Sequence, residues 1–80
     1  MILRLKYFGM LAEVIQKEEE TIDFNQKNIQ ELDDLLQSIY PKLGTMEYQF
    51  ALNHSLVGVG EEALLKDNDE IAVLPPFAGG

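Results

Sequence analysis

One segment of this 80-residue chain carries the apolar spacing of a long amphipathic helix, and this limits the folds open to the rest. Its apolar residues fall at i, i+3, i+6, i+7 and i+10, which forms one stripe: Ile29, Leu32, Leu35, Leu36 and Ile39. Asn28 can cap this helix, and Glu31 follows three residues later as in a capping box. Pro41 disfavours helical geometry at Tyr40, so the pattern predicts where the helix begins and ends.

The remaining segments are short and mostly alternate between apolar and polar residues, which is typical of half-buried strands. The expected strands are residues 3–7, 21–24, 49–52, 56–57 and 70–74. Residues 10–15 follow Gly9 and have the spacing of a short helix. The acidic run 18–20 is expected to be a solvated loop, and residues 53–55 and 67–69 have turn chemistry.

This order of elements predicts an α+β fold in which one main helix packs against a mixed sheet of four or five strands, with a short extra helix. That arrangement is the ubiquitin-like β-grasp. We expect residues 1–74 to form the domain and residues 75–80 to form an extended, flexible tail. A chain of 80 residues buries only about 60% of its unfolded surface. It therefore has no room for a deep active site, and we expect a partner to complete any chemistry.

Charge and composition exclude several classes of function. The chain has 6 Lys and Arg against 14 Asp and Glu, a net charge of −8 that would repel nucleic acid and anionic membranes. We expect instead a protein partner with a basic docking face. The absence of Cys excludes disulfides, thiolate zinc sites and cysteine nucleophiles.

No metal site is expected either, because His54 is the sole histidine and lies in a turn cluster. The start of the chain interleaves charged and apolar residues, unlike a signal peptide, and no apolar stretch approaches about 18 residues. These features predict a cytoplasmic protein.

The end of the chain holds the residues best suited to carry chemistry. These are Pro75, Pro76, Phe77, Ala78, Gly79 and Gly80. The prolines are stiff and extended, so six residues can project a carboxylate up to about 20 Å from the sheet. Glycine has no Cβ, so Gly79 and Gly80 can enter a channel too narrow for a side chain. An activating enzyme would have to convert the unreactive carboxylate of Gly80 to an acyl-adenylate before sulfur or an amine attacks it.

The chain resembles the small subunit of molybdopterin synthase, a ubiquitin-like sulfur carrier of the MoaD/ThiS type. The resemblance covers essentially the whole chain, and three segments carry it: residues 5–13 (LKYFGMLAE), Leu52 with Asn53, and residues 67–80. The double proline and the terminal double glycine are its most specific part. The chain departs from the family at Ala12, where an Arg is common, and at Asn68, where a Gly is common. The first change puts one docking contact in doubt, whereas Asn tolerates left-handed turns.

The resemblance implies a role in molybdenum cofactor biosynthesis. An activating enzyme related to ubiquitin-activating enzymes would use ATP to adenylate Gly80, which would then become a thiocarboxylate. The tail would enter the large synthase subunit and donate sulfur to a pyranopterin precursor to build the dithiolene. The chain would bind no cofactor of its own and would act as the non-catalytic, sulfur-donating member of a sulfurtransferase heterotetramer.

Docking to that subunit requires an outward apolar surface. If the odd-numbered residues of the first and last strands face the core, Phe8 and Leu74 face outward. With Leu56 they would anchor an interface that continues into the tail through Pro75, Pro76, Phe77 and Ala78. In the family the positions that match these anchors face the large subunit.

Three other functions remain open. In the first, the chain is a sulfur carrier for thiazole or another sulfur-containing metabolite, although such carriers usually lack this proline pair. It would alternatively be a protein modifier that joins Gly80 to lysines, or an interaction module with an inert tail. Recovered high-mass conjugates would reveal the modifier, and tolerance of an added C-terminal residue would reveal the inert tail.

Overall fold

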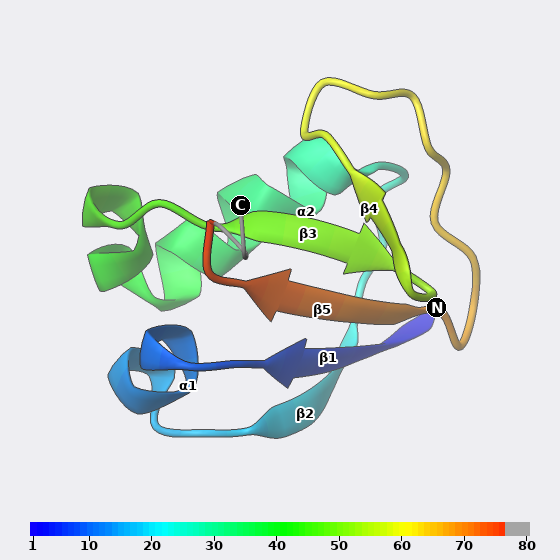
Figure 1. Cartoon of the computed structure of the whole chain (residues 1–80). Coiled ribbons are helices and arrows are strands. Elements are labelled where there is room, and N and C mark those ends of the chain that lie inside the picture. The colour runs from blue at the N-terminus through cyan, green and yellow to red at the C-terminus, as the bar shows by residue number, and fades with distance from the viewer. Residues whose placement is uncertain (77–80) are drawn as a thin grey trace.

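The computed structural model describes residues 1–76, which form a five-stranded sheet with one main helix. The elements in chain order are β1 (Ile2–Tyr7), α1 (Met10–Ile15), β2 (Glu19–Asp23), α2 (Ile29–Ile39), the 3-10 helix η1 (Pro41–Thr45), β3 (Gln49–Leu52), β4 (Ser55–Val57) and β5 (Glu70–Leu74). Strand β1 pairs with β5 in parallel and with β2 antiparallel, and the sheet order is β2-β1-β5-β3-β4 (Figure 1). The predicted ubiquitin-like β-grasp is confirmed.

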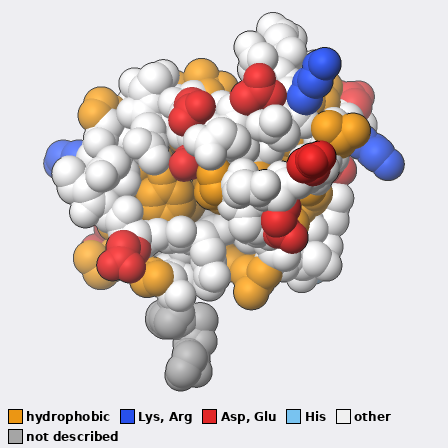
Figure 2. Space-filling view, turned by 90° about the horizontal axis from the view of Figure 1, so that it is seen from above, with side chains coloured by type: hydrophobic (Ala, Val, Ile, Leu, Met, Phe, Trp, Pro, Cys, Tyr) orange, Lys and Arg blue, Asp and Glu red, His pale blue; other side chains and the backbone are white. Residues whose placement is uncertain are grey.

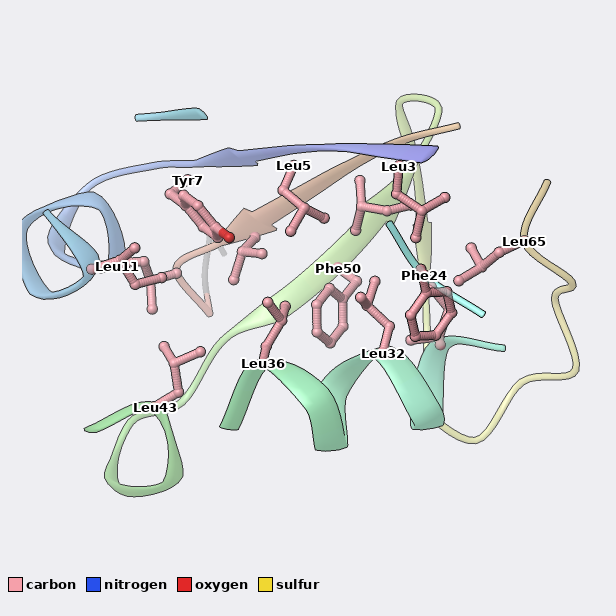
Figure 3. Close-up of a cluster of buried hydrophobic side chains, with 14 residues drawn as sticks. Leu3, Leu5, Tyr7, Leu11, Phe24, Leu32, Leu36, Leu43, Phe50 and Leu65 are labelled. Carbon is pink, nitrogen blue, oxygen red and sulfur yellow. The ribbon is translucent and has the colours of Figure 1, made fainter. Parts of the chain in front are cut away.

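The core lies between the sheet and α2. Side chains from β1, including Leu3, Leu5 and Tyr7, point toward Leu32 and Leu36 of α2 (Figure 3). Phe50 of β3 lies between the two layers, and every one of these side chains is almost completely buried. Because strand residues alternate between faces, this burial leaves the even-numbered residues of β1 on the opposite face of the sheet.

Helix α2 begins and ends where the sequence predicts. The Asn28 side chain accepts from the Glu31 backbone N–H at 2.9 Å, and the Glu31 carboxylate accepts from the Asn28 N–H at 3.2 Å, which completes the capping box. The predicted apolar stripe is only partly buried, since Leu35 is half-buried and Ile39 is 48% exposed. The chain turns at Pro41 into η1, an element the sequence did not predict, and Leu43 of η1 joins the core.

Strand β2 corrects two expectations about residues 18–24. It runs from Glu19 to Asp23, so it begins within the acidic run and ends before Phe24, which is buried beyond the strand. Glu20 is half-buried rather than solvated, because three donors reach its carboxylate. The prediction of a solvated loop, which rested on the charge of residues 18–20, is therefore wrong for Glu20. The hydroxyl groups that bind its carboxylate come from elements distant in sequence.

The tight turns use the residues that tolerate left-handed backbone. Asn53 and His54, with φ of 49° and 78°, connect β3 to β4, which begins at Ser55 rather than at Leu56 as expected. Asn68 has φ of 71° in the turn before β5, a conformation that Asn adopts readily.

Within residues 1–76, no helix has the length and apolar character needed to cross a membrane.

Candidate functional site

One face of the sheet is covered by α2, and no helix of residues 1–76 covers the other (Figure 1). The register decides which side chains share this open face. Ala72 of β5 is paired with Lys6 on one side and Ala51 on the other, and Ala51 is paired with Leu56 of β4. Paired residues point to the same side of a sheet, so these four side chains form one row across the open face.

A second row lies nearer the end of β5, where Leu74 is paired with Gln49. Phe8 directly follows β1 and is 44% exposed, and Leu56 is 64% exposed. We call the apolar group on this face the sheet patch; it consists of Phe8, Ala51, Leu56, Ala72 and Leu74. The register thus brings the three predicted anchors, from strands distant in sequence, to one face of the molecule.

Charged residues occupy the other end of the open face. Glu70 at the start of β5 lies 3.8 Å from an Arg4 nitrogen and 3.6 Å from Lys6 Nζ. His54 Nε2 is 3.8 Å from the same carboxylate, and the His54 side chain is exposed in its turn, as predicted.

Elsewhere the surface is mainly acidic, and Figure 2 shows acidic side chains spread over the face that it draws, with basic ones near its margins. The open face therefore offers a partner an apolar patch beside a cluster of one carboxylate and two basic side chains.

The sheet patch adjoins the point where the chain leaves the sheet. Strand β5 ends at Leu74, and the Pro75 carbonyl accepts a hydrogen bond from Gln49 Nε2 at 3.2 Å. Gly9 lies against the other side of the Pro75 ring, so close that an added Cβ would be 3.1 Å from Pro75 Cγ. Residues 77–80 lie outside the described part of the chain, and with them the predicted roles of Phe77, Ala78, Gly79 and Gly80.

A polar cluster beside Pro76 was not anticipated from the sequence. The buried Asp33 carboxylate accepts a 2.5 Å hydrogen bond from Tyr48 Oη, and Gln37 Nε2 lies 3.4 Å from both carboxylate oxygens. Burial raises the pKa of Tyr48 to about 12, and the hydrogen bond to Asp33 adds to this shift. Because each polar group here has a partner, the cluster is suited to stabilising the fold rather than to catalysis.

Ala12 lies beside this face, since it lines a shallow hollow together with Lys6 and Phe8. Ala12 of α1 is half-buried and packs against the core, where it presents no polar group. Within residues 1–76, no group of three or more metal-ligating side chains comes together.

Comparison with known proteins places this geometry in a family. The model of the ThiS family matches residues 5–80, which is nearly the whole chain. This chain belongs to the ThiS family. The match includes the residues of the sheet patch and extends past Pro76 into the terminal segment.

Relatives of this ThiS-family chain have names that refer to molybdopterin synthesis or to protein modification. It is 33% identical over 85 residues to a molybdopterin synthase sulfur carrier subunit of Chlamydomonas reinhardtii, with 100% of each chain covered. Its fold matches a structure of subunits 1 and 2 of molybdopterin-converting factor from Helicobacter pylori, with 32% identity, a TM-score of 0.69 and 100% of both chains covered. It also matches the small archaeal modifier protein 1 of Methanosarcina acetivorans, at 28% identity and a TM-score of 0.76, covering 99% of this chain and 96% of that one.

Proposed function

We propose that this chain is the sulfur-carrier subunit of a molybdopterin synthase. The geometric observation that carries the proposal is the position of the sheet patch. It adjoins Pro75, where the C-terminal segment begins and leaves the sheet. A carrier needs both features together, because the body must bind outside a partner while the carboxylate at Gly80 reaches that partner's reaction centre. The ThiS-family match and the name of the Chlamydomonas relative support the same assignment.

The chemistry proposed for Gly80 proceeds in two steps. A carboxylate oxygen attacks the α-phosphorus of ATP, pyrophosphate leaves, and an acyl-adenylate forms. Hydrosulfide, or an equivalent sulfur donor, then attacks the acyl carbon and displaces AMP, which leaves a thiocarboxylate. ATP is bound by the activating enzyme, and this chain holds no cofactor of its own.

The partner in the sulfur-transfer step is the large synthase subunit. In the Helicobacter pylori structure a protein 32% identical to this chain forms a complex with subunit 2. We propose that Phe8, Leu56 and Leu74 anchor the corresponding complex here, in a two-by-two heterotetramer within the cytoplasm. The segment from Pro75 through Gly79 leads Gly80 to the pyranopterin precursor, and side chains of the large subunit carry out the acid–base steps.

Mass spectrometry tests this proposal directly. The untagged chain is incubated with the activating enzyme, ATP and a sulfide source, and fragmentation then locates any added mass. Localisation is essential, because oxidation of a methionine adds nearly the same mass as exchange of oxygen for sulfur. Sulfur on Gly80 is the expected result, and an unmodified Gly80 would contradict the proposal.

A variant with one extra residue after Gly80 is the matched control, because it retains residues 1–80 but moves the carboxylate away from Gly80. It should accept no sulfur on Gly80, and its melting temperature should equal that of the wild type. If this variant still supported sulfur transfer, the carboxylate of Gly80 would not be required as the carrier.

Protein modification is the second candidate function. The similarity to the Methanosarcina acetivorans modifier, over nearly the full length of both chains, favours considering it. A modifier would form isopeptide bonds between Gly80 and lysines of other proteins. High-mass conjugates that contain this chain, recovered from its own cells, would show that activity whether or not sulfur is also carried.

A further inference from the structure

The two prolines after Leu74 interrupt the hydrogen-bond ladder of β5. Pro75 and Pro76 have no backbone N–H, so neither can donate to a neighbouring strand. The pairing of Gln49 with Leu74 is accordingly the last pair between β3 and β5. At Pro75 and Pro76 the backbone itself can be held only through carbonyl oxygens and through packing of the proline rings.

Gln49 supplies such a hydrogen bond through its side chain. Its Nε2 donates to the Pro75 carbonyl at 3.2 Å, and both residues are half-buried. The side-chain amide thus takes the place of a backbone donor and extends the contact between β3 and the chain by one residue. Because Gln49 is itself part of β3, the donor is fixed to the rigid sheet.

Gly9 fixes the same proline from the other side. Its φ of 59° and ψ of −135° lie in a region that residues with a side chain rarely adopt. A Cβ at this position would also approach Pro75 Cγ to 3.1 Å, closer than ordinary contact. The end of β1 is held beside β5 by a hydrogen bond from Phe8 N–H to the Val73 carbonyl at 3.2 Å. Gly9 therefore lets the two strand ends approach closely enough for the Pro75 ring to pack.

We propose that Gln49 and Gly9 form a seat for Pro75 that sets the direction in which the C-terminal segment leaves the sheet. Both are positioning residues, since they act through Pro75 and touch no reacting group. The inference deepens the proposed function and rests on it for its purpose. A segment held at its root has less conformational freedom to lose when it enters a partner, so the seat favours productive docking.

A distance measurement on the free, full-length chain tests the seat. The chain has no native Cys, so Ser38→Cys on α2 and Ala78→Cys provide two unique sites for spin labels. Pulsed electron paramagnetic resonance then gives the distribution of distances between the labels. Gln49→Met has nearly the same size but no donor, and it should broaden this distribution, whereas Gln49→Lys keeps a donor and should restore the narrower one.

Gln30→Met is the matched control, because Gln30 is exposed on α2 and, among residues 1–76, its amide bonds only to Asp34 of the same helix. It should leave the distribution unchanged. Equal widths for wild type and Gln49→Met would overturn the seat, and so would equal broadening by Gln30→Met. Gly9→Ala should broaden the distribution as well, and the Gln49 variants still test the seat if Gly9→Ala fails to fold.

Binding to the large subunit provides the functional test. Loss of one hydrogen bond that orders the segment should weaken the affinity of Gln49→Met by about two- to tenfold, with recovery in Gln49→Lys. An unchanged affinity in Gln49→Met would overturn the seat's role in docking. The distance measurement requires neither sulfur nor a partner, so a failure to load Gly80 would refute the carrier function without affecting the seat.

Discussion

The Tyr7 hydroxyl donates a 2.6 Å hydrogen bond to Oε2 of Glu20, although 13 residues separate them in the chain. Tyr40 Oη donates to the same oxygen at 2.6 Å, and Lys17 Nζ lies 3.0 Å from Oε1. One carboxylate of β2 therefore joins β1 to Tyr40, the residue that directly follows α2. Glu20 is paired with Leu5, so the cluster lies on the core side of the sheet, whereas Phe8, Leu56 and Leu74 lie on the open face.

Replacement of Glu20 by Ala should destabilise the fold without affecting sulfur loading. The Tyr7 residue is only 2% exposed, so its hydroxyl would lose its partner with little access to water. The expected loss in free energy of unfolding is about 1–3 kcal/mol, measured by urea denaturation. Glu19→Ala is the control, because Glu19 is the exposed neighbour in the same strand. Equal losses in the two variants would show that the hydroxyl contacts do not stabilise the fold.

The same carboxylate should make stability depend on pH in the acid range. Partial burial raises the pKa of Glu20, but hydrogen bonds from Tyr40, Tyr7 and Lys17 outweigh it and hold the pKa below its ordinary value of 4.5. The unfolded chain then binds this proton more tightly than the folded chain. The stabilisation is present above pH 4.5 and is lost as the pH falls through the folded pKa.

Urea denaturation of wild type and Glu20→Gln between neutral and acid pH measures this linkage. The difference in unfolding free energy between the two proteins should be constant near neutrality and shrink below pH 4.5. The two proteins share every other carboxylate, so those groups contribute equally to both curves. A difference that stays constant down to acid pH would contradict the shifted pKa.

Two adjacent leucines of α2 should respond differently to truncation. Leu36 is completely buried against the sheet, whereas Leu35 is half-buried at the side of the helix. Leu36→Ala should therefore cost about 2–5 kcal/mol of unfolding free energy, and Leu35→Ala should cost less. Chemical denaturation of both variants measures the difference. A larger cost at Leu35 would mean that the helix is rotated relative to the sheet.

The sheet patch should be required for docking and dispensable for folding. Leu56→Asp places a charge in the patch, so binding to the large subunit should be lost while the melting temperature changes little. Leu64→Asp is the matched control, because Leu64 is 65% exposed, as Leu56 is at 64%, but lies outside the patch in the segment before β5. Calorimetry measures both affinities. Comparable losses in the two variants would show that general surface charge, and not the patch, controls binding.

The sequence alone determined the elements whose signals are local. The capping pair at Asn28 and Glu31, the turn residue Asn68 and the proline after Leu74 each act within a few residues, so their effects follow from composition and spacing. The alternation in β1 and β5 likewise predicted that Phe8 and Leu74 point away from the core. The resemblance to a sulfur carrier came from the same kind of local evidence, in the residues near both ends of the chain.

Only the tertiary structure decided which distant residues meet. Gln49 reaches the Pro75 carbonyl across 26 residues, and Glu20 accepts from Tyr40 across 20. The acidic run therefore looked like a solvated loop, and Gln49 had no feature that distinguished it from other polar strand residues. Such contacts depend on strand order and register, which the hydrophobic energy of the whole core selects, and no short stretch of sequence contains that information.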